Sequence, residues 1–494
     1  MYSLNTPPHP LLLPPPLLTM SSTTTTSHLL HPFHHHHLPK PKPSPLRLRL
    51  RSALSDPRLL HLAEKLEDSV SPSLPLLHNL RLSSSDSILS KSWPTRRDDP
   101  FRYTDLSLLK SSQIEPSPPS PSSPLPDEPQ LFPNRFYILD GHVIPSLSSL
   151  PNLPNGVYVG GISGVPDRIA GSVLDSFSGF RDGDLFWDLN GIGAPDVAVV
   201  YVPEGCRVEE PLHLKYVFGG GGGERRLAVS NPRVLVVVER GGEIGIVEEF
   251  GGGGGDGFYW ANSVAEVAIG EGGRVSHSYV QRQELGSAHT KWTLVQQGSS
   301  STYELVEIST GGKLSRHNLH IQQLGPDTVT ELSSFHMSRS DQLLDLHSKL
   351  VLDHPRGYAR QLHKCVVSHS SGKVVFDGNI QVNRYAQQTD AGQQTRSLPL
   401  TPRPCINVKP NLKIVADDVK CSHGAAISNL EDSQQLFYFK ARGIDTQTAR
   451  DAVVFSFGAE VLSRLPYEAL RKSLASDLKG LIADKETIHL PDEI

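Results

Sequence analysis

Residues 234–244 read VLVVVERGGEI, a run of aliphatic and mostly β-branched side chains that ends in a glycine turn. Such a run is typical of a buried strand, because branched side chains pack well on a pleated surface. Comparable runs recur between about Gly156 and Ser428, at 157–159, 197–202, 264–269, 303–308 and 374–376. Almost no helical pattern interrupts them, so this part of the chain is predicted to consist of short strands.

The turn that follows this strand recurs as well. A small residue, a glycine, a charged residue and an aliphatic residue occupy 241–244, 272–275, 311–314 and 371–374. Measured on the aliphatic residue, the turns are 31, 39 and 60 residues apart, which indicates a degenerate repeat with inserted loops. We therefore expect a right-handed parallel β-helix, whose coils bury their inner faces against one another. A β-sandwich is the alternative, although roughly 270 residues of short strands would make a large one.

The segments on either side of this region differ in composition and period. The predicted fold class is mainly β, with a helical region before and after the β-helix. We expect a disordered leader at 1–55, an N-terminal helical region at 56–110, an extended Pro/Ser-rich linker at 111–133, a β-helix core at 134–430 and a C-terminal helical domain at 431–494.

The leader has the composition of an organellar transit peptide. Residues 1–55 contain no Asp or Glu, many Ser and Thr, and an arginine-rich end at 47–51. The apolar stretch 11–18 is broken by three prolines and precedes the basic residues, which fits neither a secretory signal nor a membrane span. Its richness in Ser, Thr and Pro favours the chloroplast, with cleavage near residues 50–56.

Charge and cysteine content narrow the classes of function. Outside the leader, 42 Lys and Arg face 52 Asp and Glu, so nucleic acid is not an expected partner. The four cysteines, at 206, 365, 405 and 421, are widely spaced. This spacing predicts reduced thiols and argues against a self-contained zinc ribbon or a four-thiolate cluster site.

The helical period returns after Asn429. One helix is predicted from Glu431 to Arg442 with Gly443 after its end, a second from a cap at Asp445 or Thr446, and a third after Pro466. Most apolar positions of these helices would be core. The residues left exposed could form a surface for a partner, namely Tyr438, Arg442 and Phe455.

Cys421 and His423 are the candidate ligands of the chain. Residues 419–423 are expected to be extended, and side chains two apart on a strand lie on one face. A thiolate beside an imidazole suits a soft or borderline metal, iron–sulfur clusters included. Two ligands are at most half of a metal site, and a buried thiol next to a surface histidine is the plainer interpretation of an isolated Cys-x-His.

Other motifs are weaker evidence for a binding or catalytic site. The glycine runs 219–223 and 251–255 lack a following Gly-Lys-Ser/Thr and a helix, so we interpret them as loops and not as phosphate cradles. His363, Cys365 and His369 share a strand face, but the interrupted spacing favours an ordinary alternating strand over a metal site. A β-helix carbohydrate-active enzyme would need paired carboxylates, and the adjacent Asp417 and Asp418 would point in opposite directions.

Several motifs together resemble the SufD family of the SUF iron–sulfur cluster assembly scaffold. The resemblance covers about residues 93–465, and its last two motifs are specific. The motifs are Pro94-Thr95-Arg96-Arg97 with Tyr103-Thr104-Asp105, Tyr201-Val202-Pro203 with Glu210-Pro211-Leu212, Ala416 to Ala425, and Phe437-Tyr438-Phe439-Lys440-Ala441-Arg442-Gly443-Ile444.

The resemblance implies a non-catalytic scaffold subunit in the chloroplast stroma. Such a subunit pairs with a SufB-like paralogue and binds a SufC-like ATPase through its C-terminal helices, here through Tyr438, Arg442, Gly443 and Phe455. His423, with Cys421 beside it, would meet the paralogue where a transient Fe–S cluster forms, and ATPase dimerisation would expose both. No residue can be assigned to a reduced flavin. A purely structural subunit, in which His423 is inert, is the remaining alternative.

Overall fold

The computed structural model describes residues 56–70, 75–118, 130–177, 180, 182–219, 223, 225–251, 257–428, 430 and 434–484. The predicted transit peptide, residues 119–129 of the linker and most of both glycine runs lie outside these residues. Ala53–Ile494 forms one compact unit. No helix within its described part is both long and apolar enough to cross a membrane.

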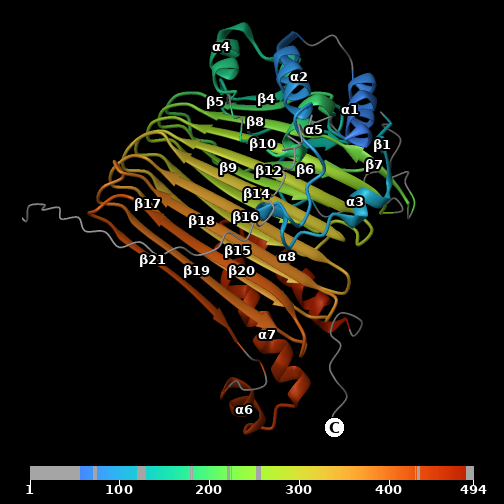
Figure 1. Cartoon of the computed structure of the whole chain (residues 1–494). Helices are drawn as coiled ribbons and strands as arrows, with labels where there is room; N and C mark the ends of the chain where they lie inside the picture. The colour runs from blue at the N-terminus through green and yellow to red at the C-terminus, as the bar shows by residue number, and fades with distance from the viewer. Residues whose placement is uncertain are drawn as a thin grey trace, which may run out of the picture. The chain divides into compact units, whose positions relative to one another are not determined.

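The body of this unit is a parallel β-solenoid, as the sequence predicts (Figure 1). From β8 onward, successive strands alternate between two sheets, so that each pair of strands forms one coil. Sheet A runs in the order β4 (Tyr158–Gly161), β5 (Ala198–Val202), β8 (Arg233–Val238), β10 (Tyr259–Ile269), β12 (Ala288–Gln297), β14 (Leu314–Gln323), β16 (Leu343–Leu352), β18 (Lys373–Val382) and β20 (Cys405–Ile414), with β1 (Gln113–Pro116) and β7 (Arg226–Ser230) beside it.

Sheet B lies opposite sheet A across the interior of the solenoid. It runs in the order β3 (His142–Val143), β2 (Asn134–Leu139), β6 (Leu212–Val217), β9 (Glu243–Phe250), β11 (Arg274–Gln281), β13 (Thr302–Ser309), β15 (Val329–Ser338), β17 (Tyr358–Val367), β19 (Asp390–Pro399) and β21 (Lys420–Ile427).

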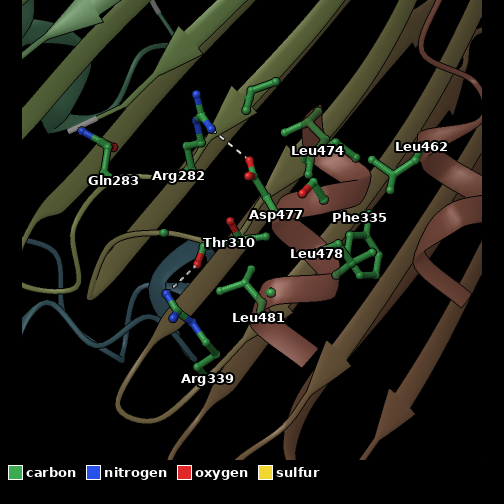
Figure 2. Close-up of a pocket in the computed structure, with 15 residues that line it drawn as sticks. Arg282, Gln283, Thr310, Phe335, Arg339, Leu462, Leu474, Asp477, Leu478 and Leu481 are labelled. Atoms are coloured by element: carbon green, nitrogen blue, oxygen red, sulfur yellow. Dashed lines mark hydrogen bonds and ion pairs between the residues drawn. The ribbon is translucent and has the colours of Figure 1, made fainter. Parts of the chain in front are cut away.

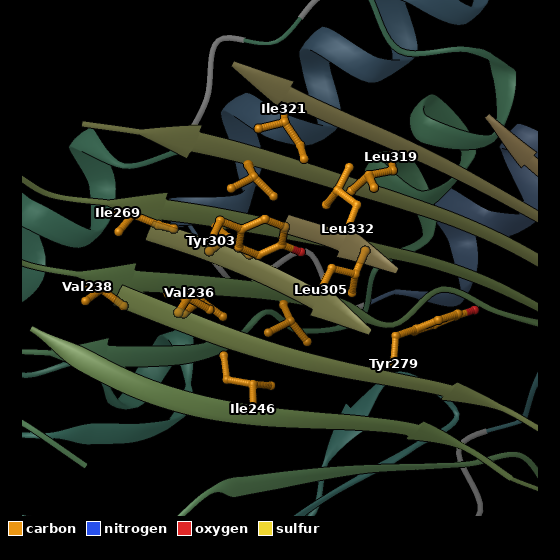
Figure 3. Close-up of a cluster of buried hydrophobic side chains, with 14 of the residues drawn as sticks. Val236, Val238, Ile246, Ile269, Tyr279, Tyr303, Leu305, Leu319, Ile321 and Leu332 are labelled. Atoms are coloured by element: carbon orange, nitrogen blue, oxygen red, sulfur yellow. The ribbon is translucent and has the colours of Figure 1, made fainter. Parts of the chain in front are cut away.

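The recurring glycine turn closes the coils for a conformational reason. Gly241 and Gly272 have φ angles of 64° and 65°, in the left-handed region that glycine adopts without steric cost. Side chains from the two sheets meet inside, as Figure 3 shows for Val236 and Ile269 of sheet A with Leu305 of sheet B. This shared interior makes every coil depend on the next one, as in other solenoids.

Two helices interrupt the β-region, which corrects the expectation that almost none would. These are α4 (Asp167–Asp175) and α5 (Leu185–Gly193), with the short η2 (Ile162–Gly164) before them. Every residue of α5 is buried, so it has no polar face whose 3.6-residue period could be recognised. Asp184 is the N-cap residue of α5. Its carboxylate accepts hydrogen bonds from the backbone N–H groups of Phe186 and Trp187.

Part of the predicted extended linker at 111–133 pairs with the body of the protein. Gln113–Pro116 forms β1, which pairs in parallel with β7. Proline is tolerated there because it lies at the end of a short strand on the edge of the sheet.

Helices cover both sheets from outside. On the N-terminal side these are α1 (Pro57–Ser69), α2 (Pro75–Ile88), η1 (Asp99–Phe101) and α3 (Ser107–Ser111), and α1 and α2 pack against α5. On the C-terminal side, α6 (Gln434–Lys440), α7 (Thr446–Leu462) and α8 (Glu468–Ala483) follow the last strand. Val454 of α7 and Leu474 of α8 belong to the same buried hydrophobic cluster as Phe335 of sheet B. Asp445 caps α7 by accepting a hydrogen bond from the N–H of Thr448.

Candidate functional site

The solenoid ends in an open coil formed by β20 and β21. They are the last strands of the two sheets, and no other strand of the described chain pairs with their outer edges. Their residues are all exposed or half-buried, whereas β18 and β19 of the preceding coil alternate between buried interior positions and more exposed outer ones. Three aliphatic side chains at this end are exposed: Ile414 by 45%, Val415 by 50% and Ile427 by 72%. An open edge with exposed apolar side chains is a surface on which another chain can pair.

Cys421 and His423 both lie on β21, on its interior face. Cys421 is in register with the buried Ala391 of β19 and packs half-buried against the interior core. His423 is in register with Gln393, which is also buried, but is itself exposed because no further coil covers it. The two side chains therefore share one face at the open end of the solenoid, as the spacing predicts.

The backbone of these two residues faces the open edge. The N–H groups of Lys420 and Ser428 donate to the carbonyls of Thr389, just before β19, and Ser397 of β19, at 2.8 and 2.9 Å. Because N–H groups alternate in direction along a strand, the odd-numbered residues of β21 direct their N–H and C=O groups away from β19. A strand added to this edge would thus bond to Cys421 and His423 themselves.

Burial raises the pKa of the Cys421 thiol, since it disfavours the thiolate, and the nearby Asp390 acts in the same direction. A hydrogen bond from the backbone of Ala391 opposes this shift. The free thiol is therefore held protonated at neutral pH, and a metal would have to displace that proton. In the part of the chain that the structure describes, no group of three or more His, Cys, Asp or Glu residues could hold a metal ion.

The C-terminal residues singled out from the sequence lie on α6, in the turn that follows it and on α7. Tyr438 is 53% exposed, and the Arg442 guanidinium carbon lies 3.4 Å from the centre of its ring. Tyr438 lies on α6, and Gly443 lies in the turn after that helix with a φ angle of 78°. Phe455 is half-buried on α7, and the Lys479 ammonium lies 5.1 Å from its ring centre. Phe437, which is 76% exposed, was missed and extends the surface around Tyr438.

The interior of the solenoid holds charged groups that the sequence analysis missed. The Lys291 ammonium lies 2.9 Å from both carboxylate oxygens of Glu248, and a ring nitrogen of His277 lies 3.0 Å from that carboxylate. Burial alone would raise the pKa of Glu248, but Lys291 and His277 hold it well below its ordinary value. The carboxylate is therefore ionised inside the protein.

A second buried carboxylate lies further along the interior. Glu307 contacts ring nitrogens of His317 and His336, both at 2.9 Å. Burial alone would raise the pKa of Glu307, but these two contacts outweigh burial and lower it. His363 then contacts the hydroxyl of Ser334 at 2.8 Å. Polar residues at alternate positions of strands were a signal for this network, but alternation alone indicates a solvated face just as well.

His363, Cys365 and His369 do not come together as a metal site. His363 and Cys365 are buried inside the solenoid, and the Cys365 thiol donates to the Ser397 hydroxyl at 3.3 Å. Burial raises the pKa of Cys365 to about 12. His369 lies in the turn after β17, where its ring contacts Ser371 at 2.8 Å.

A cavity of about 440 Å³ lies between α8 and sheet B (Figure 2). Leu474, Leu478 and Leu481 of α8 line it, and Arg282, the residue after β11, forms an ion pair of 2.9 Å with Asp477. The mostly apolar lining makes this cavity part of the packing that fastens α8 to the solenoid. Neither Cys421 nor His423 lines it.

Comparison with known proteins gives consistent matches. Residues 220–457 match the family model "SUF system FeS cluster assembly, SufBD core domain". Protein ABCI7, chloroplastic, of Arabidopsis thaliana is 56% identical over 443 residues, which is 87% of this chain and 92% of that protein. An iron-sulfur cluster assembly SufBD family protein of Synechocystis is 33% identical over 411 residues, 81% of this chain and 90% of its own. The iron-sulfur cluster assembly protein SufD of Escherichia coli is 27% identical over 397 residues, 78% of this chain and 89% of its own.

Proposed function

Because this chain belongs to the SufBD family of iron–sulfur cluster assembly proteins and is of the SufD type, we propose that it is a scaffold subunit that pairs with a SufB-like paralogue. Pairing would occur through the open coil of β20 and β21, and a nascent cluster would form there as cargo. The observation that carries this proposal is the placement of Cys421 and His423, with side chain and backbone both at an edge that a second chain must complete.

Two ligands leave a cluster incomplete, so the remaining ligands would come from the paralogue. His423 is exposed and Cys421 half-buried, hence a second chain could reach both. The buried carboxylates Glu248 and Glu307 are ion-paired inside the solenoid, which supports a scaffold over a carbohydrate-active enzyme with carboxylates in a groove.

Co-expression with a SufB-like paralogue and a SufC-like ATPase tests this proposal. We expect His423→Ala and Cys421→Ser to leave the complex intact on gel filtration while iron and sulfide per complex fall. The matched control is His61→Ala on α1, a histidine whose side chain is 67% exposed far along the chain from β21. Full cluster content in the His423→Ala complex would favour the purely structural subunit.

The C-terminal helices would bind the ATPase. Tyr438, Arg442, Gly443 and Phe455 are the proposed contacts, and the exposed Phe437 adds apolar area beside Tyr438. We expect Tyr438→Ala to weaken co-purification of the ATPase but not of the paralogue. Tyr385→Ala is the control, because Tyr385 is 78% exposed in the loop between β18 and β19.

ATP-driven dimerisation of two ATPases would open the interface and expose Cys421 and His423. Labelling of Cys421 by a thiol reagent should then be faster with ATP than without it. Cys206 serves as an internal control, since it is also a half-buried free thiol. Equal labelling rates of Cys421 with and without ATP would contradict this gating. The place of action would be the chloroplast stroma, in keeping with the chloroplastic relative and the predicted leader.

A further inference from the structure

A buried glutamine lies next to the proposed ligand His423. Gln393 of β19 is the register partner of His423 on β21, and the side chains of both residues are on the interior face. Gln393 is only 1% exposed, although it is adjacent to the open end of the solenoid. Its amide is thus a fixed polar group beside an exposed imidazole.

A chain of hydrogen bonds fixes the direction of this amide. Gln361 of β17 donates to the hydroxyl of Ser348 at 2.7 Å, and Gln393 donates its own Nε2 to Oε1 of Gln361 at 2.7 Å. This series of hydrogen bonds crosses the interior, since Ser348 belongs to sheet A and the two glutamines belong to sheet B. Because Nε2 is bound to Gln361, the Oε1 atom is the group of the amide that is left to accept a hydrogen bond from the following coil, which contains His423.

The structure leaves room for the amide at this position. A Cβ atom at Gly378 of β18 would lie 2.3 Å from Nε2 of Gln393, so a larger residue there would displace the amide. The Oε1 atom is buried and accepts no hydrogen bond from the described residues. Thr395 is the next interior residue of β19. Its hydroxyl does not donate to Oε1 of Gln393, because it donates to the carbonyl of Gly424 at 3.3 Å. A buried acceptor without a donor is costly and therefore rare in native proteins.

We propose that Gln393 is a positioning residue for His423: rotation of the exposed ring would let its N–H donate to Oε1 of Gln393, which has no donor among the other described residues. One nitrogen would be held protonated by this bond, and the other would be left as a lone-pair donor facing the open edge. Histidine ligands commonly have their second nitrogen oriented in this way, and loss of the orienting group weakens metal binding. The inference rests on the proposed role of His423 and names the group that would orient it.

The test uses the full chain, folded and without metal, labelled with ¹⁵N-histidine. The His423 ring signals are identified by their loss in His423→Ala. At a pH where the ring is neutral, we expect one tautomer in the wild type and a mixture in Gln393→Met. The rescue variant Gln393→Glu retains an acceptor and should restore a single tautomer. Gln394→Leu is the control, because Gln394 is exposed on the same strand and faces outward.

Identical His423 ring shifts in the wild type, Gln393→Met and Gln393→Glu would overturn the inference. Should Gln393→Met fail to fold, Gln361→Met releases the amide instead, and a tautomer ratio unchanged in that variant has the same meaning. In the co-expressed complex we expect Gln393→Met to weaken iron retention about 10-fold. If His423→Ala removes the cluster while the tautomer is insensitive to Gln393, the proposed function stands and the positioning role does not.

Discussion

The Lys291 ammonium lies 2.9 Å from both carboxylate oxygens of Glu248, and their side chains are 0% and 2% exposed. The aromatic ring of Phe250 lies 5.2 Å from the same ammonium. Taking two charges out of water is repaid only when each finds good partners inside, and here the carboxylate also contacts His277 and accepts a hydrogen bond from Tyr216. The pair is therefore a point at which the interior is sensitive to substitution.

Removing the cation alone should be strongly destabilising. Lys291→Met leaves the Glu248 carboxylate buried without its main counter-charge, which costs about 3–5 kcal/mol in comparable cases. The measurement is the free energy of unfolding in urea. The double variant Lys291→Met with Glu248→Gln should recover part of the loss, because no unpaired charge is left inside.

Arg240→Met is the matched control for this experiment. Arg240 also pairs with a glutamate, Glu204, at 2.6 Å, but both side chains are exposed. Exposed pairs contribute little, so its unfolding midpoint should not change measurably. A single variant Lys291→Met as stable as the wild type would contradict the role assigned to the interior pair.

Stability should fall on mild acidification because of buried neutral histidines. Burial lowers the pKa of His363 well below its ordinary value, an effect that the adjacent His336 reinforces, and burial does the same to His289, with Lys291 adding to the shift. Below about pH 6.5 the unfolded chain binds a proton at each of these residues and the folded chain does not. Each histidine thus removes about 1.4 kcal/mol of unfolding free energy per pH unit from about pH 6.5 down toward its folded pKa.

Urea unfolding at pH 7.0 and 5.5 measures this dependence. His363→Leu removes one of these two histidines. The slope of unfolding free energy against pH should therefore be smaller by about 1.4 kcal/mol per pH unit, the contribution of one bound proton. The change in slope is informative even if the variant is less stable at pH 7.0. An unchanged slope would show that His363 takes up a proton in the folded protein.

The N-terminal region is joined to sheet A by a buried hydroxyl. Thr104 donates to the Asp345 carboxylate at 2.6 Å and accepts a hydrogen bond from Arg316 at 2.9 Å. Thr104→Val keeps the shape but leaves both charged groups short of a partner, which should cost about 1–3 kcal/mol. Tyr103→Phe is the control, since Tyr103 is 49% exposed, and its unfolding midpoint should match that of the wild type.

Local patterns predicted the architecture where they matched the final environment. The valine run at 234–238 became β8, and the glycines at 241 and 272 have the positive φ angles that a recurring turn requires. The same rules failed for α5, whose residues are buried all round, and for β1, whose strand depends on pairing with β7 over a hundred residues later. Burial and long-range pairing are properties of the assembled coils and leave no local period.

The candidate site shows the same division. The two-residue spacing of Cys421 and His423 is sufficient to predict that they share one face of a strand. Gln393 could not be connected with His423 from sequence, because the register between their strands depends on the length of the intervening turns. The same holds for Lys291 and Glu248, which are 43 residues apart in the chain.

The open edge of β21 can be tested with proline, which lacks an N–H group. Ala425 directs its N–H toward the open edge, whereas the neighbouring Ala426 directs its N–H toward β19. Ala425→Pro should therefore leave the chain folded but remove a hydrogen bond that a partner strand would accept. We expect it to reduce co-purification of the SufB-like paralogue, with an unfolding midpoint close to that of the wild type.

Ala426→Pro should instead lower stability, if the N–H groups of β21 alternate between β19 and the open edge as described. It breaks a bond inside the chain, so the unfolding midpoint should fall, and any loss of pairing should follow from lost folding. Because the two variants differ by one position on the same exposed strand, general effects of proline on this segment cancel in the comparison. Equal loss of pairing and equal loss of stability in both would mean that the edge of β21 is not the pairing surface.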